Sequence, residues 1–308
     1  MVWSCLVSIL PGMAQTEKLT DYVNPFVGTD GYGNVYPGAQ IPFGGIQISP
    51  DTDSRFYDAA SGYKYNHLTL MGFSLTHLSG TGIPDLGDFL FIPGTGEMKL
   101  EPGTHEDPDQ GYRSRYSHDK EWASPNYYAV ELADYGVKAE MTSGVRSGMF
   151  RFTYPESDNA FIMIDMNHTL WQSCEWSNLR MINDSTITGY KLVKGWGPER
   201  HVYFTATFSK KLTGLRFVQD KKPVIYNTSR FRSSYEAWGK NLMACISFDT
   251  KAGEEVTVKT AISAVSTDGA RNNMKELDGL TFNELRAKGE GLWEKELGKY
   301  TLTADRKT

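Results

Sequence analysis

The stretch Val202-Tyr-Phe-Thr-Ala-Thr-Phe208 alternates apolar residues with tyrosine and threonine. Successive side chains of a strand point to opposite faces, so this pattern predicts a strand with one buried face. The same period of two appears around Glu131 and in Glu255-Val-Thr-Val-Lys-Thr-Ala-Ile262. Half-buried strands in series are typical of antiparallel sheets that pack face to face. We therefore predict a mainly β fold, a two-sheet antiparallel sandwich.

The C-terminal residues change to a helical period. Thr281 and Glu284 form the pattern of a capping box, which predicts a helix over 281–300, and residues 268–277 predict a shorter helix before it. The longer helix carries a bulky apolar stripe made of Phe282, Leu285, Leu292, Trp293 and Leu297. Helices that follow all the strands suggest a connection to a further domain, and we expect this stripe to lack a partner within the chain.

Composition excludes several classes of protein. The chain has 308 residues, of which 40% are apolar and 22% charged, as in globular proteins and not in disordered ones. Its 32 basic and 37 acidic residues give a net charge of −5 and form no basic stripe, which excludes nucleic acid as the expected partner. No interior run is long and apolar enough to predict a membrane span.

The N-terminus predicts export. Residues 1–15 are uncharged and apolar, and Gly12-Met-Ala14 fits a small-x-small cleavage site, although the basic leading segment of a signal peptide is lacking. With Cys5 inside this signal, the mature chain keeps Cys174 and Cys245. We expect two free thiols, with Cys245 in the core.

The densest group of chemically useful residues is His77-Leu-Ser-Gly-Thr-Gly-Ile-Pro-Asp-Leu-Gly-Asp88. Its glycines allow a ligand to approach the backbone, and Asp85 and Asp88 are acceptors suited to sugar hydroxyls or a hard cation. The alternative is a rigid turn in which the aspartates cap backbone amides. The residues alone leave both interpretations open.

Other site types are not supported. The glycine-rich segment Asp30-Gly-Tyr-Gly-Asn-Val-Tyr-Pro-Gly38 lacks the Gly-Lys-Ser/Thr of a phosphate loop. The six histidines are scattered without the spacing of a zinc site, and neither an EF-hand pattern nor a Gly-x-Ser-x-Gly elbow occurs.

A long series of motifs resembles the N-terminal part of glycoside hydrolase family 92, secreted exo-α-mannosidases of glycan-degrading gut bacteria. The resemblance covers nearly all of the mature chain. The motifs are Tyr22-Val-Asn-Pro-Phe-Val-Gly-Thr29, Gly33-Asn-Val-Tyr-Pro-Gly38, Pro42-Phe-Gly44, Gln47-Ile-Ser-Pro-Asp51, Ser61-Gly-Tyr63, Gly72-Phe-Ser-Leu-Thr-His-Leu-Ser-Gly-Thr-Gly82, Asp85, Gly87-Asp88, Tyr116-Ser-His-Asp-Lys-Glu121, Ala123-Ser-Pro125, Tyr127-Tyr128, Ala261-Ile-Ser-Ala-Val-Ser266 and Leu292-Trp-Glu-Lys-Glu-Leu297.

The resemblance implies an architecture. Family members have an N-terminal sandwich like that of galactose mutarotase, called a supersandwich, then a helical linker and an (α/α)6 barrel. For this chain it implies a signal peptide over 1–14, the sandwich domain over 15–267 and the linker over 268–308. The barrel would lie outside the chain.

The resemblance also implies a function. Family enzymes are calcium-dependent, invert configuration and act on mannose-containing glycans, with α-1,2 linkages the expected type. Their general acid and base are carboxylates on the barrel, so no catalytic residue is expected here and the chain is expected to be inactive alone. Calcium ligands are expected mostly on the barrel, which is the expected partner together with the glycan. The implied location is the periplasm or the exterior of a Gram-negative bacterium.

The sandwich of the family contributes loops to the pocket of the terminal sugar. The substrate-binding candidates are Gly28, Asp30, Asn34, Phe56, Tyr57, Tyr63, His77, Ser79, Asp85 and Asp88. Where family members often have a tryptophan before Ser-Gly-Tyr, this chain has Phe56-Tyr-Asp-Ala-Ala60, so the stacking contact is expected at Phe56 or Tyr57. Two alternatives remain: a non-catalytic carbohydrate-binding sandwich, and a structural or adhesive surface domain.

Overall fold

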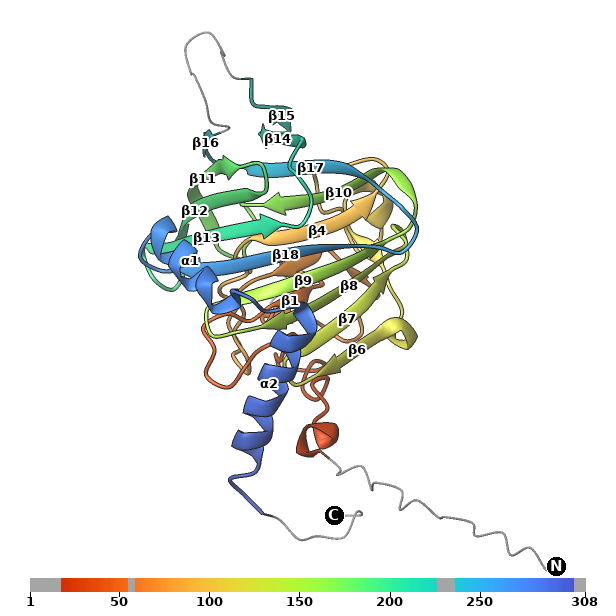
Figure 1. Cartoon of the computed structure of the whole chain (residues 1–308), viewed down its shortest axis with the longest axis vertical. Helices are drawn as coiled ribbons and strands as arrows, with labels where there is room; N and C mark the ends of the chain where they lie inside the picture. Colours follow the sequence, from red (N-terminus) through yellow and green to blue (C-terminus); the bar gives the residue numbers. More distant parts are fainter. Residues whose placement is uncertain (1–17, 55–58, 226–235, 302–308) are drawn as a thin grey trace, which may run out of the picture.

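The computed structural model describes residues 18–54, 59–225 and 236–301. Two large antiparallel sheets, of seven and nine strands, dominate the fold (Figure 1). This confirms the predicted antiparallel sandwich. The predicted signal peptide lies outside the described residues. No helix in the described ranges is long and apolar enough to cross a membrane.

Each sheet combines strands from distant parts of the chain. In spatial order, the seven-stranded sheet consists of β1 (Ser49–Asp51), β3 (Gly72–Ser74), β4 (Leu90–Thr95), β10 (Ser157–Asp165), β17 (Leu242–Thr250), β14 (Gly214–Gln219) and β15 (Lys222–Pro223). The nine-stranded sheet consists of β16 (Glu236–Gly239), β11 (Ser173–Asn183), β12 (Thr186–Lys194), β13 (Arg200–Phe208), β18 (Glu254–Ser263), β9 (Ser147–Tyr154), β8 (Val137–Ser143), β7 (Tyr127–Leu132) and β6 (Glu121–Ser124). A small sheet pairs β2 (Thr69–Leu70) with β5 (Ser114–Arg115).

The main hydrophobic core lies between the two large sheets. The apolar positions of residues 202–208 are all buried in this core, as their alternation predicted. Aromatic rings join the layers: Phe91 lies 4.9 Å from Phe150, and Phe89 lies 4.4 Å from Phe204, between ring centroids. Rings at such separations add stabilisation beyond the area that they bury.

The two described cysteines are buried free thiols, as predicted. Cys245 lies in β17, where it faces a second apolar cluster of the seven-stranded sheet. Burial raises the pKa of both the Cys174 and the Cys245 thiol. Neither thiol is therefore poised as a nucleophile.

Helices follow the last strand. They are α1 (Thr267–Asn273), the 3-10 helix η5 (Met274–Leu277) and α2 (Phe282–Leu297), and shorter 3-10 helices occur earlier at η1 (Leu19–Tyr22), η3 (Pro108–Gln110) and η4 (His118–Lys120). The predicted capping box is present: the Thr281 amide donates to Glu284 Oε2 at 2.8 Å, and the Glu284 amide donates to Thr281 Oγ1 at 3.3 Å. Both predicted helical segments are thereby confirmed.

The expectation that the apolar stripe of α2 lacks a partner is wrong for most of its length. Phe282 and Leu285 are buried against β7 and β9. The Trp293 indole donates to the carbonyl oxygen of Gln40 at 2.7 Å, and only Leu292 is exposed, at 38%. The helix folds back onto the sandwich and the loops before β1, a long-range contact that a helical pattern alone does not reveal.

Two close contacts fix the direction of α2. At Gly289 a β-carbon would lie 1.7 Å from Asn126 Nδ2, so only glycine permits the helix to approach the sheet this closely. Further along, the Glu294 carboxylate accepts hydrogen bonds from the Thr20 amide at 2.7 Å and its hydroxyl at 2.6 Å. The end of α2 therefore lies beside η1, near the start of the described chain (Figure 1).

Candidate functional site

The loops that carry the predicted site residues meet at one end of the sandwich. The Gly80 amide donates to the carbonyl oxygen of Asn34 at 2.7 Å, which joins the 28–34 loop to the 77–88 loop. The rings of Tyr36 and His77 lie 5.2 Å apart. Sequence segments separated by more than forty residues thus form one surface. Phe56 and Tyr57, the predicted stacking residues, lie outside the described residues.

A buried aspartate joins the 77–88 loop to the segment that carries His168. Asp51, at the end of β1, is fully buried, and its two oxygens accept from His77 Nε2 and His168 Nε2, each at 2.8 Å. Burial opposes ionisation of this carboxyl, yet the two imidazoles hold the pKa of Asp51 well below its usual range. The aspartate is therefore an anion that binds both histidines in place.

The partners of His77 occupy both of its ring nitrogens. Its Nε2 faces the Asp51 carboxylate at 2.8 Å and the Ser74 hydroxyl at 3.1 Å, and its Nδ1 faces the carbonyl oxygen of Gln47 at 2.8 Å. The imidazole therefore positions its loop and keeps no nitrogen free for a ligand.

Asp88 closes the 77–88 loop through a second buried cluster. Its carboxylate receives Lys191 Nζ at 3.0 Å, two Arg200 nitrogens at 2.5 and 3.1 Å, and the Thr76 hydroxyl at 2.7 Å. These four contacts use the four lone-pair directions of a carboxylate. Although burial acts against it, Lys191 and Arg200 lower the pKa of Asp88. Asp88 thus ties the loop, across the core, to β12 and β13 of the nine-stranded sheet.

The predicted site residues fall into two groups. Tyr63, His77 and Asp88 are buried at 3% exposure or less, and the Tyr63 hydroxyl donates to Glu121 at 2.9 Å. These three support the loops from within, which corrects their predicted place on the ligand surface. The residues that reach the surface are Gly28, Asp30, Asn34, Ser79 and Asp85. They remain predicted ligand contacts.

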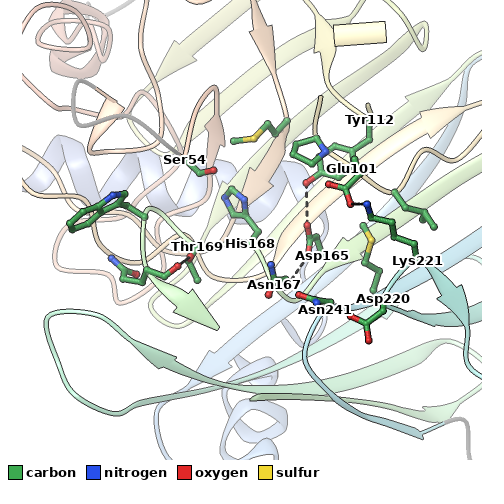
Figure 2. A pocket seen from close by; sticks show the side chains of 16 residues that line it. Ser54, Glu101, Tyr112, Asp165, Asn167, His168, Thr169, Asp220, Lys221 and Asn241 are labelled. Carbon is green, nitrogen blue, oxygen red and sulfur yellow. Dashed lines mark hydrogen bonds and ion pairs between the residues drawn. The ribbon is translucent and has the colours of Figure 1, made fainter. Parts of the chain in front are cut away.

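A cavity of about 920 Å³ lies at one end of β10 (Figure 2), and none of the predicted site residues lines it. Its lining is mainly polar: Asp165 accepts from the Tyr112 hydroxyl at 3.1 Å, and Lys221 pairs with Glu101 at 2.7 Å. His168 and Gln172 also line the cavity, so it borders the Asp51 cluster and, through the hydrogen bond from Gln172 to Pro84, adjoins the 77–88 loop. A cavity with many donors and acceptors suits a hydroxyl-rich ligand.

Sequence reasoning did not single out Asp51, His168, Lys191, Arg200 or Trp171. One signal was present for Lys191, because it occupies a core-facing position in the period of two along β12, between apolar residues. A lysine there needs a buried anion. The other residues are brought to the site by long-range contacts that have no local pattern.

Among the described residues, no group of three His, Cys, Asp or Glu side chains is arranged to hold a metal ion. The buried carboxylates of Asp51 and Asp88 face histidine, lysine and arginine partners. These two carboxylates therefore offer no free oxygen to a calcium ion, which takes six to eight oxygens. Calcium binding by this chain stays a prediction.

The architecture is thus a large antiparallel sandwich whose predicted site loops meet at one end, followed by helices. The chain belongs to glycosyl hydrolase family 92: the model of that family's N-terminal domain matches residues 22–263. The resemblance to this family is thereby confirmed.

The chain is similar to known proteins that are longer than it is. It is 26% identical to an uncharacterized secreted glycosidase of Arthroderma benhamiae, over 91% of this chain and 38% of the relative. The solved family 92 glycosyl hydrolase ccman5 is 27% identical with a TM-score of 0.79, over 93% of this chain and 38% of that one. An inverting family 92 mannosidase of Bacteroides thetaiotaomicron shares the fold, with 24% identity, a TM-score of 0.77, and coverage of 92% and 37%. The chain thus spans under two fifths of the length of these proteins.

Proposed function

We propose that this chain is the pocket-forming N-terminal part of an exported, calcium-dependent, inverting exo-α-mannosidase that acts on α-1,2-linked mannose glycans. The observation that carries the proposal is the convergence of the loops of Asp30, Ser79 and Asp85 at one end of a family 92 domain. Their oxygens and the adjoining polar cavity suit the hydroxyls of a terminal mannose. A solved relative of this fold is described as an inverting mannosidase, and another relative as secreted.

In this proposal the bond-breaking groups belong to the barrel of the family. An inverting glycosidase needs an acid and a base on opposite sides of the bond, roughly 6.5–9.5 Å apart, with water between them. Asp51 and Asp88 are buried anions held by cations, so neither donates a proton nor activates a water at the surface. The chain alone would then bind sugar weakly and hydrolyse nothing. Calcium would be held mainly by residues outside those described here.

The same proposal gives a role to several exposed apolar side chains. Val27, Tyr32 and Phe43 are 73%, 95% and 89% exposed, and Leu292 on α2 is 38% exposed. A contiguous patch of such side chains would mark a site of association. We propose that the barrel covers them and completes the sugar pocket from the opposite side.

One observation favours a second candidate, a non-catalytic carbohydrate-binding module. The apolar stripe of α2 is largely satisfied within the chain, through Phe282, Leu285 and Trp293. A helix that packs on its own sandwich does not require a barrel for burial of this stripe.

Hydrolysis of α-1,2-mannobiose separates the two candidates. The chain is assayed alone and co-expressed with a family 92 barrel, with and without chelator. We expect turnover only in the presence of the barrel, lost on calcium removal and reduced by Ser79→Ala. Turnover by the chain alone would contradict the assignment of catalysis to the barrel. Tight binding of methyl α-mannoside to the chain, with no activity in the co-expressed pair, would support the binding module.

A further inference from the structure

An unusual turn displays a tryptophan at the edge of the cavity. Trp171 is 61% exposed, and its backbone has φ +72°. A bulky residue in this left-handed region is a genuine outlier, whereas glycine would adopt it without strain. Strain of this kind persists where the surrounding structure enforces it, and it gathers at functional sites. A large exposed indole at such a position therefore needs an explanation other than packing.

The turn is enforced by hydrogen bonds to the 77–88 loop. The Leu170 amide donates to the carbonyl oxygen of Leu86 at 2.9 Å. The Gln172 side-chain amide donates to the carbonyl oxygen of Pro84, also at 2.9 Å. Within the turn, the Thr169 hydroxyl donates to the carbonyl oxygen of Gln172 at 2.7 Å. The turn that carries Trp171 is thus held against the loop that carries the predicted sugar contacts Ser79 and Asp85.

A second cavity, of about 690 Å³, lies on the other side of this turn. Trp171 and Gln172 line both this cavity and the one of about 920 Å³, so the turn separates two adjoining hollows. The wall of the second cavity formed by Gly195 and Trp196 carries a second exposed indole, since Trp196 is 70% exposed. A β-carbon at Gly195 would lie 2.4 Å from Gln172 Cγ, so this wall packs closely on the turn.

Polar groups accompany the two indoles. Glu175 and Lys194 line the second cavity, and Glu175 Oε2 is held by Lys240 at 3.1 Å. Indole faces cover the apolar C–H faces of a pyranose, while a charged group at the rim bonds its hydroxyls. Two tryptophans with a carboxylate and an ammonium at the rim therefore favour a neutral sugar ring over a lipid or a peptide.

We infer that Trp171 and Trp196 form a second subsite, which binds an inner pyranose of a mannose-containing oligosaccharide whose terminal residue lies at the 77–88 loop. This inference rests on the proposed function, because it takes its ligand class from it. The subsite would favour oligosaccharides over monosaccharides.

The test follows the tryptophan indole N–H signals of the ¹⁵N-labelled chain by NMR during titration. The probes are methyl α-mannoside and α-1,2-mannotriose. Signals are assigned with Trp171→Gly, Trp196→Ala and the control Trp122→Ala, which removes an indole of 45% exposure from β6. We expect mannotriose to shift the Trp171 and Trp196 signals, and each of these two variants to weaken its binding by about tenfold, as loss of about 1.4 kcal/mol would. The control should bind normally.

The melting temperature of Trp171→Gly shows whether weaker binding comes from a folding defect. Because glycine relieves the strained φ, Trp171→Gly should melt at the same temperature as the wild type or higher. Mannotriose that leaves both indoles unshifted, or binds the two variants as tightly as the control, overturns the inference. If methyl α-mannoside still shifts the backbone amide signals of Ser79 and Asp85 in that case, the proposed function stands without the subsite. If mannotriose shifts both indoles and those loop signals never respond, the subsite stands and the proposed pocket is overturned.

Discussion

Replacement of Asp88 by asparagine should destabilise the chain strongly, although Asp88 lies in a loop. The change keeps the shape of the side chain and removes its charge. Lys191 and Asp88 have fully buried side chains 3.0 Å apart, so Lys191 would lose its only buried counter-ion in the cluster. Arg200, whose side chain is 25% exposed, can turn toward water, whereas Lys191 cannot.

The expected loss is about 3–5 kcal/mol of unfolding free energy, the usual cost of removing one partner of a buried ion pair. The hydrogen bond from Lys191 Nζ to the carbonyl oxygen of His168, at 2.6 Å, satisfies one proton of the ammonium but does not neutralise it. Removal of both charges in Asp88→Asn/Lys191→Met should restore much of the stability, because apolar replacement of a whole buried pair is often close to neutral.

Urea denaturation followed by far-UV circular dichroism measures these differences. The matched control is Asp85→Asn in the same loop, since the Asp85 carboxylate accepts only from the adjacent Leu86 amide, at 2.6 Å, among the hydrogen bonds described. We expect this control to stay within about 0.5 kcal/mol of the wild type, as surface substitutions do. A loss below about 1 kcal/mol in Asp88→Asn, or a further loss on adding Lys191→Met, would refute the assignment of a buried charge pair.

The stability of the chain at acid pH should depend on the same ion pair between Asp88 and Lys191. The pKa of Asp88 is lower in the folded chain than its ordinary value of about 3.9, so the unfolded chain takes up the proton first as pH falls. The stabilisation from ionised Asp88 is therefore complete above that ordinary value and is lost as the pH falls toward the folded value. Asp88→Asn should show a shallower loss of stability below about pH 4 than the wild type.

Two further predictions concern the packing of the sandwich. Gly289→Ala should force α2 away from Asn126 and lower the melting temperature. Gly291→Ala, where a β-carbon meets open space, should instead raise the unfolding free energy by about 0.5–1 kcal/mol. Thermal melts of both variants test this, and equal effects of the two substitutions would contradict the close contact at Gly289. Cys174 and Cys245 should react with a thiol reagent only on unfolding, because burial shields both thiols and raises the pKa of each. Rapid labelling of either residue in the native chain, located by peptide mapping so that Cys5 is not counted, would show that it is accessible.

The fold was predictable because its signals are local. A period of two needs only neighbouring residues, so the strand over 202–208 was evident from the sequence, and the capping box of Thr281 and Glu284 marked the start of α2. The prediction failed where α2 meets the rest of the chain. Its contact with Gln40 joins residues 253 positions apart, and no helical pattern encodes it.

The candidate site could be predicted only as a set of loops. Glycine-rich segments pointed to the 28–34 and 77–88 loops, and these loops do meet, whereas their role in ligand binding stays a prediction. The groups that hold them come from far along the chain: His168 lies 117 positions from Asp51, and Arg200 lies 112 positions from Asp88. An aspartate in a glycine-rich loop looks the same in sequence whether it binds a ligand or is a buried anchor. Only the residues that contact its carboxylate in the folded chain distinguish these two roles.

These anchors explain how long glycine-rich loops hold a defined shape. Each loop pays a large entropic cost on ordering, and glycine raises that cost. The buried carboxylates of Asp51 and Asp88 receive their histidine, lysine and arginine partners from other segments, so opening a loop would leave a carboxylate charge without these partners. Because the anchors lie beneath the surface, they leave the loop tips of Ser79 and Asp85 at the surface. In the proposed sugar pocket, loops held in this way would be ordered before the sugar arrives, and binding would then cost less conformational entropy.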